Sequence, residues 1–485
     1  MMSGLSHLNV ALYRNIPKAK QVFMAGPHIT SISLGPRWSC VFRFIQTDYR
    51  TVSVNLIDRT GSEGHLSAFL ADLRSVGEEA SLVFTAHPGS ASDLTVALLE
   101  AALTYRSVDS EKLGDWIGKN YHPDWILSKA VREGIAAHHG RIPRSLGQMF
   151  VREFDRGVLK VLICTSTLIE GVNTSASNVF LYDKKINRTD FDFFSFANIR
   201  GRVGRMMRHF VGRAFFYHQP PAQVATAVDV PVLSDPSNTS DYILLNVDEN
   251  DLNREAKERV DEIVERSSLP KAILARYGSL GLERLLQTDA KIIHAVERDS
   301  SLLVWTAYPT RQQRIFFSDI ILRIFVYPRQ LQVGARTAPT LSWCLHQLSR
   351  SRSIASFLRW FVRTFQRQDS FEIVLDRAFQ FLSGCDFTFP NVIGAIESLA
   401  KHHLPAENIN YGVYIARLEN SFRPAWMKAA DEFGIPLPLA ERLAPYVPED
   451  SSIDNAVGRL RHAFRHGIDG LDEVDQRILA GALFH

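Results

Sequence analysis

The stretch from Val161 to Arg213 constrains the fold more than any other part of this 485-residue chain. It begins with the apolar run VLIC, which ends in a cluster of hydroxyl side chains, Thr165 to Thr167, and then reaches Gly171 and Asn173. A buried strand that ends in hydroxyls and glycine allows close approach to a phosphate, because glycine has no side chain to obstruct the backbone. The first half of the stretch therefore predicts a phosphate-binding turn after a buried strand.

The second half of the same stretch carries a pair of arginines. Arg202 and Arg205 follow a short apolar strand and a helical segment, and they are set between Gly201 and Gly204. A planar guanidinium can donate two hydrogen bonds to one phosphoryl group. Each glycine would cost about 1 kcal/mol in an exposed helix, so the pattern favours a functional turn over a solvated basic surface.

These two segments, in this order and at this spacing, resemble motifs V and VI of superfamily 2 DEAD/DEAH-box helicases. The wording is most similar to the superkiller-type branch, T-x-T-L-x-x-G-V-N followed by Q-x-x-G-R-x-G-R, with Asn198 in place of the usual Gln. The resemblance implies the C-terminal half of such a helicase, motifs IV to VI. Bacterial anti-phage systems such as Hachiman use a helicase of this broad type beside a nuclease, so the resemblance also suggests a defence helicase with a defence nuclease as partner.

Alternating strand and helix patterns begin at residue 61 and predict a parallel sheet with helices on both faces. Strands are expected at Ser81–Thr85, Ile135–Gly140, Lys160–Cys164, Asn178–Tyr182 and Ala214–Tyr217. The resemblance identifies this α/β region as the RecA-like C-terminal lobe of a helicase. Motif IV would lie at residues 81–88 and motif IVa at residues 138–141.

Four regions are expected along the chain. Residues 1–60 would supply a strand at Lys20–Pro27, the remnant of a first lobe, and a β-hairpin made by Trp38–Ile45 and Thr51–Ile57. Residues 61–218 would form the RecA-like lobe, and the proline-rich residues 219–250 would form a linker. Residues 251–485 would be mostly α-helical, and the resemblance implies a winged helix and a ratchet-like bundle there.

The resemblance assigns roles to the residues of these motifs. Arg202 and Arg205 would be catalytic arginines that reach the γ-phosphate of ATP. The other residues expected at the ATP cleft are Gly171, Asn173, Asn198, Gly201 and Gly204. Those expected to contact nucleic acid are Thr85, His138, His139, Gly140, Thr165 and Thr167.

Structural alternatives remain open for these segments. Motif V could be a capped strand-to-helix turn, and the two histidines could lie in a simple exposed loop. A metal site is not expected at His138 and His139, because neighbouring side chains diverge along a strand and no Cys, Asp or Glu stands at ligand spacing.

A second basic feature lies far along the chain. Arg359, Arg363 and Arg367 stand four residues apart and therefore share one face of a predicted helix. That face could follow a nucleic-acid backbone, where released counterions provide affinity. The alternative is an amphipathic helix with a solvated basic face.

The sequence contains neither a G-x-x-x-x-G-K-[ST] phosphate loop nor an acidic Walker B strand end. Its one Gly-Lys pair, Gly118-Lys119, is followed by Asn120. Because ATP and Mg²⁺ bind between two lobes in such helicases, this chain would need a polypeptide that supplies the first lobe. We expect it to bind DNA or RNA and complete that ATP site, or else to be a catalytically inactive nucleic-acid-binding or scaffold protein.

The composition, 46% hydrophobic and 22% charged, is typical of a globular protein. The net charge of +3 does not by itself indicate nucleic acid. The four cysteines form no C-x-x-C pair, and no apolar run reaches the roughly 18 residues of a membrane span. We therefore expect a cytoplasmic protein with no membrane partner.

Overall fold

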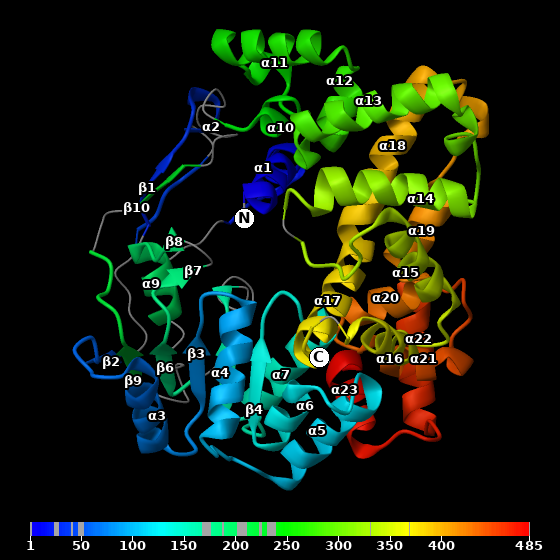
Figure 1. Ribbon diagram of the computed structural model, residues 1–485. Coiled ribbons are helices and arrows are strands. Elements are labelled where there is room, and N and C mark those ends of the chain that lie inside the picture. Colours follow the sequence, from blue (N-terminus) through cyan, green and yellow to red (C-terminus); the bar gives the residue numbers. More distant parts are fainter. Residues whose placement is uncertain are drawn as a thin grey trace. The chain divides into compact units, whose positions relative to one another are not determined.

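The computed structural model describes residues 2–23, 29–39, 42–46, 53–166, 176–186, 189–200, 211–222, 226–229, 239–329, 331–367 and 369–484 (Figure 1). The chain divides into two compact units. The helical unit consists of Met1–Asp48, Ala225–Leu345 and Gly384–Glu419. The sheet unit consists of Tyr49–Val224, His346–Ser383 and Asn420–His485.

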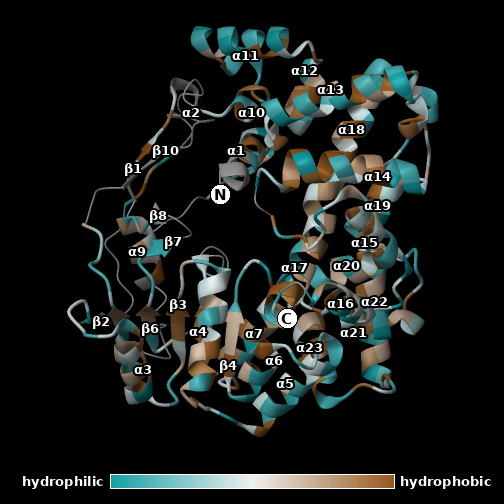
Figure 2. Ribbon diagram, viewed as in Figure 1, coloured by the Kyte–Doolittle hydropathy of each residue, from teal (hydrophilic) through white to brown (hydrophobic). Residues whose placement is uncertain are grey.

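A six-stranded parallel sheet lies at the centre of the sheet unit, with the strand order β2-β9-β6-β3-β5-β4. The strands are β2 (Ser53–Asp58), β3 (Ser81–Phe84), β4 (Ile135–His138), β5 (Val161–Cys164), β6 (Asn178–Leu181) and β9 (Val211–Phe216). Every residue of β3, β5 and β6 is buried, as expected for strands covered by helices on both faces. Figure 2 shows β3 and β6 as strongly hydrophobic. The predicted RecA-like α/β fold, followed by a mostly helical region, is confirmed.

Helices from three separate segments complete the sheet unit. Those that connect the strands are α3 (His65–Val76), α4 (Pro88–Glu100), α5 (Val108–Asn120), α6 (Ile126–Arg132), α7 (Arg144–Asp155) and α9 (Phe193–Arg200). The later ones are α16 (Ile354–Phe365), α17 (Phe371–Ser383), α20 (Ala425–Glu432), α21 (Leu437–Arg442), α22 (Ile453–His466) and α23 (Glu473–Leu483). A short antiparallel pair, β7 (Lys185–Ile186) and β8 (Thr189–Asp190), precedes α9.

The later helices share a core with the lobe. The ring of Phe379 on α17 lies 5.1 Å from the ring of Trp125 and 6.2 Å from that of Tyr121. Residues 346–383 and 420–485 therefore belong to the same compact unit as the sheet. The prediction had instead placed residues 251–485 in a single helical region.

The helical unit has its own aromatic core, in which the ring of Trp305 stacks on that of Tyr411 at 4.0 Å. Its helices are α1 (Met2–Asn15), α2 (Pro36–Ser39), α10 (Asp241–Leu244), α11 (Arg254–Ser267), α12 (Lys271–Tyr277), α13 (Leu282–Arg298), α14 (Arg311–Ile320), α18 (Phe389–His403), α19 (Gly412–Glu419) and α15 (Ala338–Arg350), which begins in it. Two parallel strands, β1 (Ile29–Ser33) and β10 (Thr226–Asp229), also belong to it. Among the described residues, none of the helices combines the length and the apolar character needed to cross a membrane.

Short 3₁₀ or π segments connect several of these helices. They are Ile16–Lys18, Glu249–Asp251, Gly278–Leu280, Ser300–Leu302, Ile321–Val326, Gly384–Thr388, Ala406–Asn408 and Ala444–Tyr446.

The β-hairpin predicted from residues 38–57 is wrong. β2 pairs in parallel with β9, from Ser53 opposite Val211 to Asp58 opposite Phe216. Trp38 and Ser39 lie in α2, and residues 42–46 form no strand. The half-buried alternation that indicated a hairpin arm fits the edge strand of a parallel sheet equally well, since both expose alternate side chains.

Two other predictions for connecting segments also change. Residues 20–23 of the expected first strand are not in a strand, and residues 24–28 lie outside the described residues. The expected linker, residues 219–250, contains β10 and α10. Residues 223–225 and 230–238 of it lie outside the described residues.

Candidate functional site

The carboxyl ends of the parallel strands meet at one edge of the sheet, which is where open parallel sheets bind ligands. β3, β5 and β4 are neighbours there. The backbone N–H of Thr85 donates to the carbonyl of Cys164 at 2.8 Å, and that of Thr165 donates to the carbonyl of His138 at 3.2 Å. The loops that follow these three strands therefore start side by side, and together they form the sheet edge.

Two threonines predicted to contact nucleic acid are buried at this edge. Thr85 is 0% exposed, and its hydroxyl donates to the carbonyl of Cys164 at 3.2 Å. Thr165 is 4% exposed. A direct contact from Thr85 to nucleic acid does not fit this geometry, because its donor joins β3 to β5 instead. The burial of Thr165 argues against a direct contact there as well.

The loop at residues 138–141 is built around two neutral histidines. Burial, followed by the nearby charge of Arg141, lowers the pKa of His139 to about 3, and burial also lowers the pKa of His138. The backbone N–H of Arg141 lies 3.4 Å from Nδ1 of His139, which accepts from it. Neither imidazole offers a positive charge near neutral pH, so the exposed Gly140 is the part of this loop that is open to a phosphate.

Helix α17 holds two loops of the lobe through carboxylates. Nη1 of Arg141 lies 2.6 Å from Oδ2 of Asp376, and Oε1 of Glu372 accepts from the backbone N–H of Ile126 at 2.7 Å, where α6 begins. Burial raises the pKa of Glu372 to about 7. Sequence reasoning missed both links, because the partners lie more than 200 residues apart and no local pattern connects them.

Replacing Glu372 with glutamine will make the sheet unit less sensitive to pH. The carboxyl has an ordinary pKa of 4.5, so its raised pKa stabilises the fold below pH 4.5, and this contribution is lost as the pH rises through about 7. Glutamine keeps an oxygen to accept from Ile126 but does not titrate. In urea unfolding, the variant should gain about 2 kcal/mol over the wild type between pH 5 and pH 8, allowing for solvent screening. A difference that does not change with pH would contradict this account of Glu372.

The glycines that partly imitate a phosphate loop lie inside helix α5. A Cβ atom on Gly114 would come within 2.4 Å of Cγ of Arg132 and 2.6 Å of the carbonyl oxygen of Ser128. Gly118, with Lys119 after it, is also buried in this helix. These glycines allow α5 and α6 to pack closely, which agrees with the rejection of this segment as a phosphate loop.

Replacing Gly114 with alanine should therefore destabilise the sheet unit by about 1–3 kcal/mol, the usual cost of overpacking. The matched control is Gly458→Ala in α22, where an added Cβ meets nothing within 4 Å. That change should be neutral or stabilising by up to about 1 kcal/mol, because alanine favours helix. Thermal unfolding of the two variants measures the contrast, and an equal effect at both positions would refute the packing argument.

Most residues of motifs V and VI lie outside the described residues. They are Thr167, Gly171, Asn173, Gly201, Arg202, Gly204 and Arg205. Asn198 belongs to α9, which ends at Arg200, directly before this arginine segment. Phe196 of α9 lines a cavity of about 170 Å³ together with the last residues of β6 and β9, Leu181 and Phe216. The first turn of α9 thus lies at the sheet edge.

Asp183 lines the same cavity and has a structural role there. Its Oδ2 accepts from the backbone N–H of Ala86 at 2.7 Å, which fixes the segment after β3 to the segment after β6. The carboxylate is therefore used in holding these two segments together.

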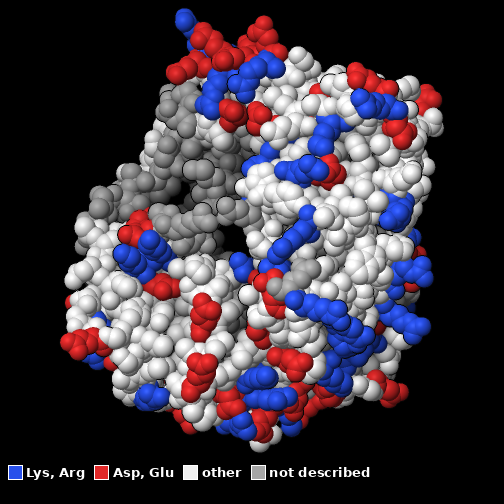
Figure 3. Space-filling view, in the orientation of Figure 1, with Lys and Arg blue, Asp and Glu red and all other residues white. Residues whose placement is uncertain are grey.

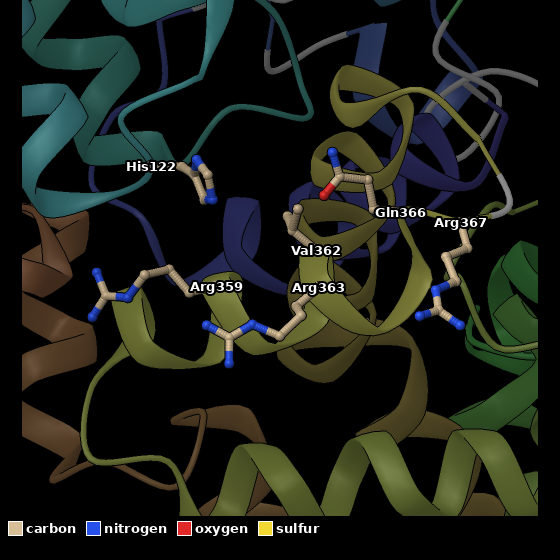
Figure 4. A pocket seen from close by; sticks show the side chains of 6 residues that line it. All are labelled: His122, Arg359, Val362, Arg363, Gln366 and Arg367. Carbon is tan, nitrogen blue, oxygen red and sulfur yellow. The ribbon is translucent and has the colours of Figure 1, made fainter.

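Of the three arginines predicted to share a helix face, Arg359 and Arg363 lie on α16, and Arg367 lies just beyond the last helical residue, Phe365. Arg359, Arg363 and Arg367 are exposed and line a cavity of about 440 Å³ together with His122, Val362 and Gln366 (Figure 4). The opposite face of α16 buries three phenylalanines, Phe357, Phe361 and Phe365. We call this cavity the α16 cavity.

Comparison with known proteins agrees with this geometry. Residues 119–209 match the family described as "Helicase conserved C-terminal domain". "Anti-bacteriophage protein B" of Escherichia coli K12 is 26% identical over 500 residues, 98% of this chain and 68% of that protein. "ATP-dependent DNA helicase Hel308" of Pyrococcus horikoshii is 30% identical over 92 residues, 18% of this chain and 13% of the helicase.

An RNA helicase also aligns with part of the chain. The "DExH-box ATP-dependent RNA helicase DExH14" of Arabidopsis thaliana is 39% identical over 85 residues, 16% of this chain and 4% of that protein. The chain therefore spans only a small part of the two helicases, whereas its similarity to the anti-bacteriophage protein extends over almost its whole length.

Proposed function

We propose that this chain completes the ATP site of a nucleic-acid motor. The chain contains the C-terminal region of a superfamily 2 helicase, and it is similar to an anti-bacteriophage protein along almost its whole length. One observation supports this most strongly. The helicase match at residues 119–209 covers the segments of motifs V and VI. The motif V segment follows β5, and the motif VI segment begins in α9, the helix that comes after β6. Both strands belong to one parallel sheet. In such a sheet, the loops after the strands carry the ligand.

The site would use ATP and Mg²⁺ only when another polypeptide, or another part of a longer chain, supplies a first lobe with a phosphate loop. Arg202 and Arg205 would then contact the γ-phosphate, since a guanidinium stabilises the charge that develops during phosphoryl transfer. Gly171, Asn173, Asn198, Gly201 and Gly204 would shape this chain's side of the cleft. The position of α9 at the sheet edge supports this arrangement.

Nucleic acid would contact the same edge through Gly140 and Thr167, with His138 and His139 holding the loop as neutral groups. The similarity to an anti-bacteriophage protein supports a role of this motor in phage defence. A nuclease would be a further partner.

The first test is binding of labelled single-stranded DNA and RNA to the purified chain, followed by fluorescence anisotropy at several salt concentrations. We expect binding that weakens steeply as salt rises, because phosphate contacts release counterions. A folded chain that binds neither strand at low salt would refute the nucleic-acid part of the proposal. Comparison of the two strands shows which of them is preferred.

A second candidate is a catalytically inactive binding or scaffold protein. The absence of a phosphate loop from the printed sequence favours it. Nucleic-acid binding without ATP turnover, in the presence of a first lobe that itself binds ATP, would support this candidate over the motor.

A further inference from the structure

We infer that the α16 cavity binds successive phosphates of one nucleic-acid strand and is a contact separate from the sheet edge. This inference rests on the proposed function, because it specifies where the nucleic acid is held.

Several other arginines of the sheet unit are paired with carboxylates. Arg377 lies 2.5 Å from Asp369, Arg423 lies 2.7 Å from Glu441, and Arg141 lies 2.6 Å from Asp376. Within the described part of the chain, no ion pair involves any arginine of the cavity. Three positive charges around one cavity repel one another, so a bound anion would stabilise this arrangement.

The spacing of these arginines suits a chain of phosphates. Arg359 and Arg363 are four residues apart on a helix, so their Cα atoms are about 6 Å apart along the axis, and Arg367 follows just beyond the helix end. Neighbouring phosphates along an extended strand are separated by a similar distance. Each arginine could therefore meet its own phosphate, and the row would follow a strand rather than a single ion.

The remaining lining residues suit the rest of a nucleotide. Val362 and Gln366 lie on α16 and in the turn that follows it, and His122 stands across the cavity on a different segment (Figure 4). The His122 ring is held by the Phe371 ring at 4.6 Å, and its Nδ1 accepts from the backbone N–H of Asp124 at 3.3 Å. An amide, an imidazole and an apolar side chain can contact a sugar or base, and about 440 Å³ is in the range of small-molecule sites.

The surrounding surface favours the same kind of ligand. On the face shown in Figure 3, Lys and Arg side chains gather over the region of α16 and α21. Such a basic surface attracts a strand from a distance and would extend the contact beyond three phosphates. An acidic protein partner could also use this charge, but its carboxylates would not repeat at the regular interval that phosphates do. Nucleic acid is therefore the ligand that we infer.

The test compares the full chain with the triple variant Arg359→Ala/Arg363→Ala/Arg367→Ala, using a labelled single-stranded oligonucleotide. We expect the variant to bind at least tenfold more weakly at low salt. The slope of log affinity against log salt should also fall by about 2, because three single-strand phosphate contacts are lost. The corresponding triple lysine variant keeps the charge and should retain most of that slope.

A matched control removes three exposed arginines from the helical unit, Arg254→Ala/Arg266→Ala/Arg298→Ala. This control changes the net charge by the same amount as the triple alanine variant. If the loss of binding belongs to the α16 cavity, the control should bind the oligonucleotide with an affinity within about threefold of the wild type. Thermal unfolding confirms that each variant is folded. If the triple alanine variant does not fold, the single change Arg363→Glu replaces it and should still reduce binding at least tenfold.

The outcomes separate this inference from the proposed function. If the wild type binds the strand and the triple alanine variant binds equally well, the inference is refuted and the proposed function stands. If the folded wild type binds no strand, both fall. Displacement of the strand by inorganic pyrophosphate or ATP at equal phosphate concentration would show a small-anion site instead. Equal displacement by polyglutamate would show an acidic protein partner, and either displacement overturns the inference.

Discussion

Replacing Asp475 with alanine will destabilise the sheet unit by about 3–5 kcal/mol, the usual cost of leaving one partner of a buried ion pair alone. The carboxylate is 0% exposed. Arg442 of α21 donates to it twice, at 2.7 and 2.5 Å, and Nε1 of Trp116 on α5 donates to it at 2.7 Å. Without the carboxylate, the buried indole N–H loses its partner and the guanidinium, which is 32% exposed, loses its ion pair. Urea unfolding measures the loss.

Two further variants identify the cause of that effect. Asp475→Asn keeps the volume and an acceptor for Trp116, so it should destabilise less than alanine does. Glu473→Ala lies on the same helix but removes an exposed pair with Lys112, and it should cost at most about 1 kcal/mol. If Asp475→Ala cost no more than Glu473→Ala, this carboxylate would not be what joins α5, α21 and α23.

Replacing Arg202 with alanine will lower nucleic-acid-stimulated ATP turnover by about 10³-fold or more in the complex with a first lobe. An arginine that contacts the transferring phosphoryl group supplies a factor of this size by stabilising its charge. Arg205→Ala should have an effect of the same kind. Turnover is measured at saturating ATP, so that the loss appears in kcat.

The matched control for this prediction is Arg208→Ala, which removes an arginine of the same segment outside the G-R-x-G-R pattern. It should keep turnover within about threefold of the wild type. Both variants should still bind single-stranded nucleic acid, since Arg202 is assigned to ATP. If Arg202→Ala retained full turnover in an active complex, the proposed role of this arginine would be wrong.

The sheet was predictable because its strands are short apolar runs between helical patterns. The expected Lys160–Cys164 and Asn178–Tyr182 correspond to β5 and β6 within a residue at each end. A strand was expected near β2, but its pairing partner was predicted wrongly. An edge strand and a hairpin arm expose the same alternate side chains, and only the partner strand, β9, distinguishes them. The cap of α4 was not predicted: His87 caps this helix by accepting from the backbone N–H of Ser90.

The candidate site was predictable to the extent that a local pattern carried it. The four-residue spacing of Arg359, Arg363 and Arg367 predicted one helix face; the first two lie on α16, the third lies beyond its end, and all three line one cavity. Burial was not visible in the sequence, so Thr85 was expected at the ligand although its hydroxyl bonds inside the sheet edge. The attachment of α17 to the lobe through Asp376 depends on the folded chain, because Arg141 lies 235 residues away in sequence.

The measurement that tests the central claim most directly is ATP hydrolysis in the presence of single-stranded nucleic acid. It compares this chain alone with a mixture of this chain and the product of the adjacent upstream reading frame, provided that this reading frame encodes a phosphate loop. We predict no turnover by the chain alone and clear turnover in the mixture. Robust hydrolysis by the chain alone would contradict the account, because it would require a phosphate loop that we do not find in this sequence. No turnover in the mixture, although the added lobe binds ATP and the two proteins associate, would contradict the proposed completion of the ATP site.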